Sequence, residues 1–448
     1  MITTGKSGGL IVAAAALLAV SVFVTDVLAE KDDGADSDLE KRVEILTEEV
    51  SRLREQMNIP ETDKELEGVY GMGPAASKVY GVTQGVSFGG YGEFYFASPY
   101  GDTDITGKVN TTDFYRFITY IGYKFNDWIV MNGEIEYEHA TTSKNYQGEA
   151  GSISVEFAYL DFLFNKGFNV RGGNLLVPMG FLNLVHEPPT YFGNIRPTIE
   201  QTIIPTTWRE MGLGAHGDVG GGFRYSAYVV NGFNADEFTA KGVRDGRQKA
   251  NRAIWEDVGG VLSLDYYHGG TFRIGGSVYA GGADQGLVAD STGAVFSVNN
   301  EIYEGHAEYS SGGFRARALV AASHISNAAA LSGALFFDDD EQTLTQQVPE
   351  SQFGWYAEAG YDVVPLLWRA RNFTLSPWIR YEQFNYQASV AGGTGLPADP
   401  VLEGALLTVG LETKPHPNVV VKLDWVHPTD QSDEPLSDEV RLGAGFIY

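Results

Sequence analysis

The sequence predicts an all-β protein, a 16-stranded antiparallel transmembrane β-barrel that is preceded by a short N-terminal coiled-coil helix. Three observations carry this prediction. Apolar and polar residues alternate in one segment after another from residue 86 to residue 448, as in strands that face lipid on one side only. The connections between these segments are alternately short and long. The first 29 residues have the features of an export signal.

The export signal is predicted for residues 1–29. Lys6 gives a short positive start, Leu10 to Val24 is almost wholly apolar, and Ala29 ends a stretch with small residues at the positions that matter for cleavage. The apolar run is shorter than the roughly 20 residues of a membrane-spanning helix. A cleaved signal peptide is therefore favoured over an uncleaved anchor, and export places the barrel in a bacterial outer membrane.

A coiled coil is predicted for residues 30–60. Its apolar seam has heptad spacing and consists of Leu39, Val43, Leu46, Val50, Leu53 and Met57. Glu49 and Arg54 would pair between parallel chains, and Pro60 ends the helix. About three heptads are marginal alone, so we expect assembly of several copies; the alternative is one amphipathic helix lying on its own domain. Residues 61–85, rich in Gly, Ala and Pro, are predicted to be a linker.

The barrel is predicted for residues 86–448. In the segment from Ile129 to Tyr137, for example, Met131 and Ile135 share one face, while Glu134 and Glu136 lie on the other. The sixteen predicted strands cover residues 87–97, 113–125, 128–140, 152–164, 168–178, 210–218, 222–232, 258–268, 271–281, 301–310, 313–325, 352–363, 373–386, 402–413, 418–428 and 437–448. An even number is what a single-chain bacterial barrel requires.

The alternating connections predict an orientation. Long connections are centred near residues 105, 146, 194, 245, 291, 338, 394 and 432, and short turns lie between them. Short turns face the periplasm in such barrels, so both barrel ends and the coiled coil are expected there. A soluble β-sandwich is the alternative, but the last strand alternates apolar residues up to the terminal Tyr448, which is typical of outer-membrane proteins.

The third long connection, from Met179 to Arg209, is predicted to fold into the lumen as a constriction. Loops of this length in a compact domain are usually functional or disordered, and this one is rich in aromatic residues, Ile and Pro. The alternative is a lid packed over the rim. The residues predicted to form the pore constriction are His186, Glu187, Arg196, Glu200, Arg209 and Glu210.

The inward faces of the predicted strands carry about equal numbers of acidic and basic residues. Mixed charge favours small polar solutes or inorganic ions and weak ion selectivity. The residues predicted to line the pore are Arg116, Lys124, Glu134, Glu136, Glu138, Arg171, Arg315, Arg317, Arg380, Glu382 and Lys422.

Several stretches resemble one family of bacterial outer-membrane porins. They are Ser87–Phe96, Gly133–Ala140, Leu176–Asn183, His186–Pro189 and Pro205–Glu210, and they are similar to the porin family that includes the phosphate-selective porins O and P. The resemblance implies a homotrimer of sixteen-stranded channels with an infolded third loop. The third connection here contains no lysine, whereas phosphate-selective members carry lysines at the constriction. A weakly selective porin is favoured, and a phosphate- or anion-selective porin is the alternative.

Other functions find little support in the sequence. The net charge of −27 disfavours a nucleic-acid partner, and the absence of cysteine excludes thiol catalysis. No hydrolase motif is present, and His186 and Glu187 precede two prolines, which prevent the helix of a zinc pair. No catalytic residue, cofactor or metal is predicted.

The acidic clusters, Asp338–Glu341 and Asp430 to Glu434, have oxygen ligands for Ca²⁺ or for cation bridges to lipopolysaccharide, but a solvated loop is favoured because calcium-loop spacing is missing. Outer-membrane lipid and lipopolysaccharide are the expected surroundings. An alternative function of a different class is that of a structural outer-membrane tether that acts through the coiled coil.

Overall fold

The computed structural model describes Arg42 and residues 68–101, 109–289, 292–338, 343–368, 372–429 and 437–448. The predicted signal peptide lies outside these residues, and so does the predicted coiled coil apart from Arg42. Residues 339–341 and 430–434, which make up most of the two acidic clusters, also lie outside them.

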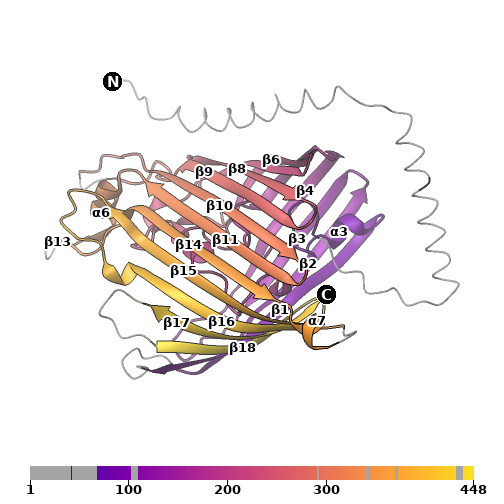
Figure 1. Ribbon diagram of the computed structural model, residues 1–448. Helices are drawn as coiled ribbons and strands as arrows, with labels where there is room; N and C mark the ends of the chain where they lie inside the picture. Colours follow the sequence, from indigo (N-terminus) through magenta and orange to yellow (C-terminus); the bar gives the residue numbers. More distant parts are fainter. Residues whose placement is uncertain are drawn as a thin grey trace.

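Sixteen strands of the described chain form one closed antiparallel barrel (Figure 1). Each neighbours the next along the chain, and β1 closes the ring against β18. The strands are β1 (Gly85–Gly101), β2 (Thr111–Asn126), β3 (Ile129–Glu138), β4 (Ile153–Asn165), β5 (Phe168–Leu176), β6 (Arg209–Gly220), β7 (Phe223–Asn231), β8 (Val258–His268), β9 (Phe272–Gly282), β10 (Asn299–Ser311), β11 (Phe314–Ile325), β14 (Pro349–Tyr361), β15 (Thr374–Val390), β16 (Glu403–His416), β17 (Val419–Thr429) and β18 (Ser437–Ile447). The predicted 16-stranded antiparallel barrel and all sixteen predicted strands are confirmed, whereas the coiled-coil helix predicted before the barrel lies, apart from Arg42, outside the described residues.

The two ends of the barrel differ. Short turns gather at the end that carries the C-terminus and the helix α7 (Val364–Leu367), as Figure 1 shows. The opposite end carries long connections with α6 (Ala328–Phe336) and the small sheet of β12 (Phe337–Asp338) and β13 (Thr343–Leu344). Within the described residues, no helix combines the length and the apolar composition that crossing a membrane requires.

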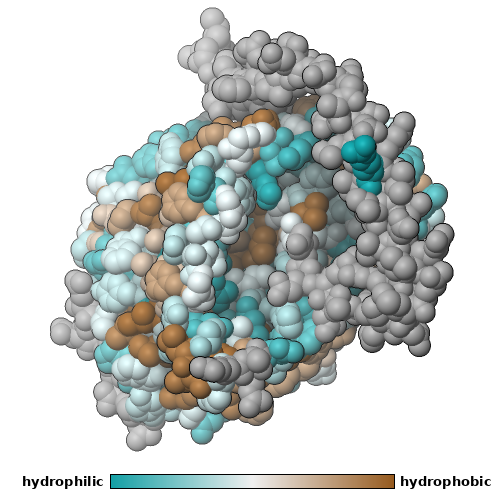
Figure 2. Space-filling model, turned by 45° about the vertical axis from the view of Figure 1, so that its right-hand side comes forward, coloured by the Kyte–Doolittle hydropathy of each residue, from teal (hydrophilic) through white to brown (hydrophobic). Residues whose placement is uncertain are grey.

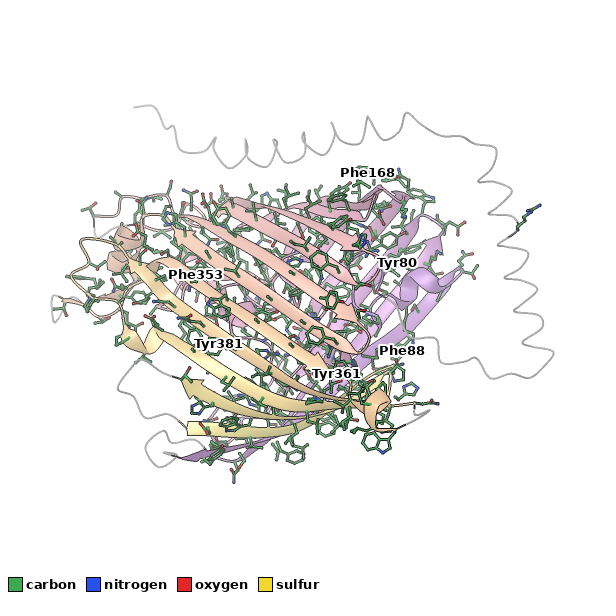
Figure 3. All side chains as sticks on the ribbon, in the orientation of Figure 1. Tyr80, Phe88, Phe168, Phe353, Tyr361 and Tyr381 are labelled. Atoms are coloured by element: carbon green, nitrogen blue, oxygen red, sulfur yellow. The ribbon has the colours of Figure 1, made fainter. Side chains whose placement is uncertain are left out.

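The outer wall is apolar and carries exposed aromatic side chains. Near the short turns, Trp128 packs against Phe164 at a ring-centroid distance of 6.2 Å, and Tyr309 packs against Phe314 at 6.1 Å. Figure 3 shows Phe88 and Phe168 toward this end and Phe353 nearer the other. Exposed aliphatic residues lie on the outer wall too, among them Ile121, Leu160, Leu213, Leu262, Ile274, Val320, Ile379, Leu411 and Leu423. Figure 2 shows hydrophobic surface, in brown, on the outer wall and a recess at the end turned to the viewer.

Residues 68–84 pack inside the barrel, although a linker is predicted for them. Met72, Ala75, Ala76 and Val79 are at most 3% exposed, and the short helix α3 (Lys78–Gly81) contacts β1, β2 and β3. Small residues allow this close approach, since a Cβ at Gly122 of β2 would lie 2.4 Å from Cγ2 of Val79. The Gly and Ala content that predicts a linker is here the means of packing a segment against the inner wall.

Candidate functional site: the third loop and the inner wall

The third loop, defined here as residues 177–208 between β5 and β6, crosses the barrel interior. Tyr191 donates a hydrogen bond to Glu93 of β1 at 2.9 Å, and the amide of Asn194 donates one to Asp424 of β17 at 2.8 Å. Further along, the N–H of Thr198 donates to a carboxylate oxygen of β15 at 2.6 Å. The loop therefore bonds to strands on several sides of the barrel. It contains the short helices η1 (Pro188–Thr190) and α5 (Ile199–Thr202).

Basic side chains of the inner wall hold consecutive carbonyl groups of this loop. Lys422 donates to the carbonyl oxygens of Tyr191 and Gly193 at 2.9 and 2.8 Å. Arg380 donates to the carbonyl of Phe192 at 2.7 Å. Lys414 and Arg317 donate in the same way to Pro189 and Thr190, at 2.7 and 3.2 Å. Cations from β11, β15, β16 and β17 thus satisfy backbone acceptors that the loop would otherwise bury without partners.

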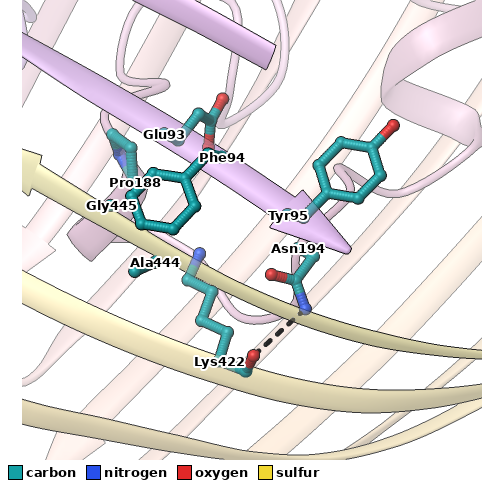
Figure 4. Close-up of a pocket in the computed structure, with 8 residues that line it drawn as sticks. All are labelled: Glu93, Phe94, Tyr95, Pro188, Asn194, Lys422, Ala444 and Gly445. Carbon is teal, nitrogen blue, oxygen red and sulfur yellow. Dashed lines mark hydrogen bonds between the residues drawn. The ribbon is translucent and has the colours of Figure 1, made fainter. Parts of the chain in front are cut away.

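Where the loop meets β1, β17 and β18 there is a recess of about 10 Å³, close to the space that one water molecule needs. Figure 4 shows Glu93 and Lys422 on opposite sides of it, with the hydrogen bond from Asn194 to the carbonyl of Lys422. The lining residues are Glu93, Phe94, Tyr95, Pro188, Asn194, Lys422, Ala444 and Gly445.

Two of the predicted constriction residues fasten segments of the chain to each other. The Glu187 carboxylate accepts the N–H groups of Ala75 and Ala76 at 2.9 to 3.0 Å, and burial raises the pKa of Glu187 to about 7. The Glu200 carboxylate accepts the N–H groups of Phe181 and Leu182 and the hydroxyl of a β14 tyrosine. Burial raises the pKa of Glu200 as well. Both carboxylates stabilise the loop itself.

The remaining predicted constriction residues are also buried. Arg196 donates to Thr206 at 2.5 Å, and Arg209 donates to Ser154 at 2.9 Å. Glu210 accepts hydrogen bonds from the side-chain amide of Asn231 and the N–H of Gln248, at 2.6 and 2.9 Å. His186 lies beside Glu134 and Glu156 of the wall, with Nε2 3.6 and 3.8 Å from their oxygens. A role of these six residues in conduction stays a prediction.

The eleven residues predicted to line the pore lie on the inward-facing side of their strands. Eight of them are buried, and about half pair with an opposite charge, as in Arg116–Glu93 (3.0 Å), Arg171–Asp161 (2.8 Å), Arg315–Glu412 (2.9 Å), Arg317–Glu308 (2.8 Å) and Arg380–Glu358 (2.8 Å). Lys124 and Glu138, near opposite ends of the β2–β3 hairpin, are partly exposed. Many of these charges therefore pair along the wall, and a role of the eleven residues in lining a pore stays a prediction.

The fourth loop, defined here as residues 232–257, contributes basic residues that the sequence prediction does not include. Arg244 donates to the carbonyl of Gln201, and Arg247 donates to the carbonyl of Thr206, both in the third loop. Burial and the charges of Arg247, Arg209 and Arg244 lower the pKa of Lys249. The signal is visible in the sequence, since this acidic chain carries five basic residues between positions 241 and 252.

Asp161 is a second omission from the predicted inner wall. It lies in β4 and is fully buried. It accepts from Arg171 and from Nε2 of His216, both at 2.8 Å, and from the hydroxyl of Tyr80 at 2.7 Å. Asp161 therefore links the β4–β6 wall to the packed segment 68–84, a contact for which local strand pattern gives no indication.

Comparison with known proteins gives one relative in sequence and a general likeness in structure. No family model matches the chain. Among solved structures, the chain is similar to OmpT of Vibrio cholerae in its trimer form (12% identity, TM-score 0.48, covering 82% of this chain and all of that one). It is also similar to an anion-selective porin of Comamonas acidovorans (11%, 0.49, covering 81% and 99%) and to the channel DcaP of Acinetobacter baumannii (12%, 0.48, covering 81% and 97%).

The relative in sequence is an "uncharacterized protein" of Aquifex aeolicus. It is 32% identical over 405 residues, which cover 89% of this chain and 87% of the relative. The alignment therefore covers most of both chains. The chain belongs to the same family as this Aquifex aeolicus protein.

Proposed function

We propose that this protein is an outer-membrane channel through which small polar solutes and ions diffuse passively. The observation that carries the proposal is the contrast between the two faces of the closed barrel. The outer face exposes large apolar side chains, for example Leu213 at 56% and Phe164 at 56%. The inner face carries charged residues such as Arg116, Glu134 and Arg171. A barrel with a lipid-facing outside and a polar inside has the composition of a membrane channel.

The aromatic residues near the short turns support the same proposal. Side chains such as Trp128, Phe164 and Phe223 stay exposed on the outer wall, where aromatic rings are favoured at the boundary between lipid and water. The short-turn end then faces the periplasm, because long loops of such barrels face outwards. Lipid and lipopolysaccharide are accordingly the proposed surroundings of the outer wall.

The third loop is the proposed constriction. It is bonded to several strands from inside, and the inner wall pairs most of its charges locally, which supports weak ion selectivity. A periplasmic coiled coil remains part of the proposal on the strength of the heptad pattern, and a homotrimer on the strength of the family resemblance alone. The resemblance to the phosphate-selective porins O and P also stays a prediction.

An anion-preferring channel is the second candidate. It is favoured by the basic residues that the third loop, the start of β6 and the fourth loop bring near one another, namely Arg196, Arg209, Arg244, Arg247 and Lys249. The electrostatic influence of three of these arginines on Lys249 indicates that they are close. A concentration of positive charge at a narrow passage raises the local concentration of anions.

Single-channel recording tests the proposal. Purified protein in a planar bilayer should give stepwise openings under a KCl gradient, with a reversal potential that indicates weak ion preference and no block by added phosphate. Strong anion preference with phosphate block would establish the second candidate. A folded protein that gives no openings would contradict both and favour the structural tether.

A further inference from the structure

Three buried side chains with metal-ligating atoms meet where the third loop touches the wall. They are Glu134 of β3, Glu156 of β4 and His186 of the third loop, which are 0%, 0% and 2% exposed. Their ligand atoms all lie within 4.8 Å of one another. The Nε2 atom of His186 is 3.6 Å from Oε1 of Glu134 and 3.8 Å from Oε1 of Glu156.

The orientation of His186 leaves an unprotonated nitrogen pointing at the carboxylates. Nδ1 of His186 lies 3.2 Å from the carbonyl oxygen of Asn183, and a carbonyl only accepts hydrogen bonds, so Nδ1 carries the proton. In the neutral ring, Nε2 then presents a lone pair to two carboxylates. A hydrogen bond from the second ring nitrogen to a backbone carbonyl is the arrangement by which proteins orient histidine ligands of metals.

A bulge in β4 brings the second carboxylate to this point. The register between β3 and β4 shifts at Glu134, which faces Phe157, while Ile135 faces Val155. Glu156 is the extra residue, and both it and Phe157 are buried. Bulges re-aim side chains next to functional sites. Without the bulge, strict alternation would send either Glu156 or Phe157 to the outer wall.

The cluster contrasts with the paired carboxylates elsewhere on the inner wall. Other buried carboxylates of the described chain, such as Asp161 and Glu358, accept hydrogen bonds from a guanidinium. Both carboxylate oxygens of Glu134, both of Glu156 and Nε2 of His186 are buried, and none of them accepts a hydrogen bond from a described residue outside these three. Arg196 and Arg209 interact electrostatically with Glu156, but their hydrogen bonds go elsewhere: Arg196 donates to Thr206, and Arg209 donates to Ser154.

We propose that His186, Glu134 and Glu156 bind a divalent transition-metal ion, which fastens the third loop to the β3–β4 wall. Two buried carboxylates beside an imidazole nitrogen repel one another unless a cation or a shared proton lies between them, and a metal cation satisfies all three groups at once. Two ligand atoms of one tetrahedral zinc ion lie about 3.3 Å apart, given bond lengths of about 2.0 to 2.1 Å, so the observed separations of 3.6 and 3.8 Å need only a small contraction. The imidazole favours zinc and similar metals over Ca²⁺ and Mg²⁺, which prefer oxygen ligands.

No metal site is predicted from the sequence, because the three ligands are separated by 22 and 30 positions and come from two strands and a loop. Three protein ligands leave one position of a tetrahedral metal for water or a fourth group. The metal would join a loop to the wall behind it, so its removal should loosen the loop.

Zinc uptake by the full-length protein in detergent tests this inference. The protein is stripped with a chelator, dialysed against Zn²⁺, and its bound metal is measured by mass spectrometry. We expect one zinc ion per chain, with an affinity at least about 10-fold lower in Glu156→Gln and His186→Gln. The matched controls are Glu149→Gln and His268→Gln, which make the same chemical changes at exposed positions and should bind zinc as the unaltered protein does.

Two results would overturn the proposal. One is that the unaltered protein takes up no zinc, which would mean that the two carboxyl groups share a proton instead. The other is that the site variants bind zinc as tightly as the controls, which would mean that exposed residues bind it. If the site variants fail to fold, X-ray absorption spectroscopy at the zinc edge of the unaltered protein identifies the ligands of the bound zinc. It should give one imidazole nitrogen with carboxylate oxygens at about 2.0 to 2.2 Å, and a coordination shell without imidazole would contradict the site.

Discussion

The carboxylate of Glu187 accepts the N–H of Ala75 through both of its oxygens, at 2.9 and 3.0 Å, although 112 positions separate the two residues. One oxygen also accepts the N–H of Ala76 at 3.0 Å. This contact joins the third loop to the segment that precedes β1. Two parts of the chain that enter the barrel separately therefore hold each other in place.

Glu187→Gln should weaken this attachment. Above the Glu187 pKa of about 7 the carboxylate is charged; a neutral amide offers one acceptor oxygen in place of two, and hydrogen bonds to charged groups contribute about 1.5–3 kcal/mol each. We expect the amides of Ala75 and Ala76 to exchange hydrogen about 10-fold faster, as measured by mass spectrometry. Glu149→Gln at an exposed loop position is the matched control and should leave this exchange unchanged. Equal exchange in both variants would show that other contacts hold residues 68–84.

Gly122→Ala should displace the same segment from the other side. A Cβ at this position would lie 2.4 Å from Cγ2 and 2.5 Å from Cβ of Val79, so α3 must move. Gly133→Ala is the control, because its nearest neighbour would be 3.6 Å away. Proteolysis at residues 68–84 should accelerate in the first variant only. If both variants resist proteolysis at residues 68–84, Val79 does not pack against Gly122 in solution.

Arg380→Gln should destabilise the barrel strongly. Arg380 pairs with Glu358 at 2.8 Å and holds the carbonyl of Phe192, and removing one partner of a buried pair typically costs about 3–5 kcal/mol. Arg224→Gln is the control, because Arg224 is half exposed and lies 3.8 Å from Asp218. Such pairs contribute about 0–1 kcal/mol. Thermal unfolding in detergent measures the difference, and equal stability of the two variants would contradict the anchoring role of Arg380.

The double variant Arg196→Gln, Arg209→Gln should move the reversal potential of the channel towards cations. Both guanidiniums are buried in or beside the third loop, and their removal leaves the acidic residues of the inner wall in excess. Arg252→Gln, at an exposed position of the fourth loop, is the control. If the potential does not move, the third loop lies outside the conduction path.

The preference of the channel for anions should decrease as pH rises, and this decrease should occur at a lower pH than that at which an ordinary lysine loses its charge. Burial and the charges of Arg247, Arg209 and Arg244 lower the pKa of Lys249 below its ordinary value of 10.5, while Glu138 opposes the shift. The folded protein therefore holds this proton less tightly than the unfolded chain. The charged form costs stability at neutral pH, and this cost disappears as pH rises towards 10.5.

Reversal potentials recorded at neutral pH and just below pH 10.5 check this expectation. The pH-dependent change should be smaller in Lys249→Gln than in the unaltered protein. Lys144→Gln, at an exposed position of another loop, should behave like the unaltered protein. An identical pH dependence in all three proteins would show that Lys249 does not contribute to ion selectivity.

The barrel could be predicted from the sequence because each strand carries its own pattern. Met131 and Ile135 are outward-facing and Glu134 and Glu136 are inward-facing, as alternation requires, and short turns such as the one after Asn126 fix which strands are neighbours. These signals are local. They depend on the two-residue period of a strand and on the chemistry of turns, so sixteen strands could be recognised without knowledge of their contacts.

What fills the barrel was decided by the tertiary structure. The composition of residues 61–85 predicts a linker, yet Ala75 reaches Glu187 and Val79 fits against Gly122. Irregular segments have no repeating pattern, and their positions depend on which distant donors and acceptors they meet. The sequence alone determined the barrel and the mixed charge of its inner face. Only folding decided that those charges hold two chain segments inside it and bring Glu134, Glu156 and His186 together, because such contacts join residues that no local pattern relates.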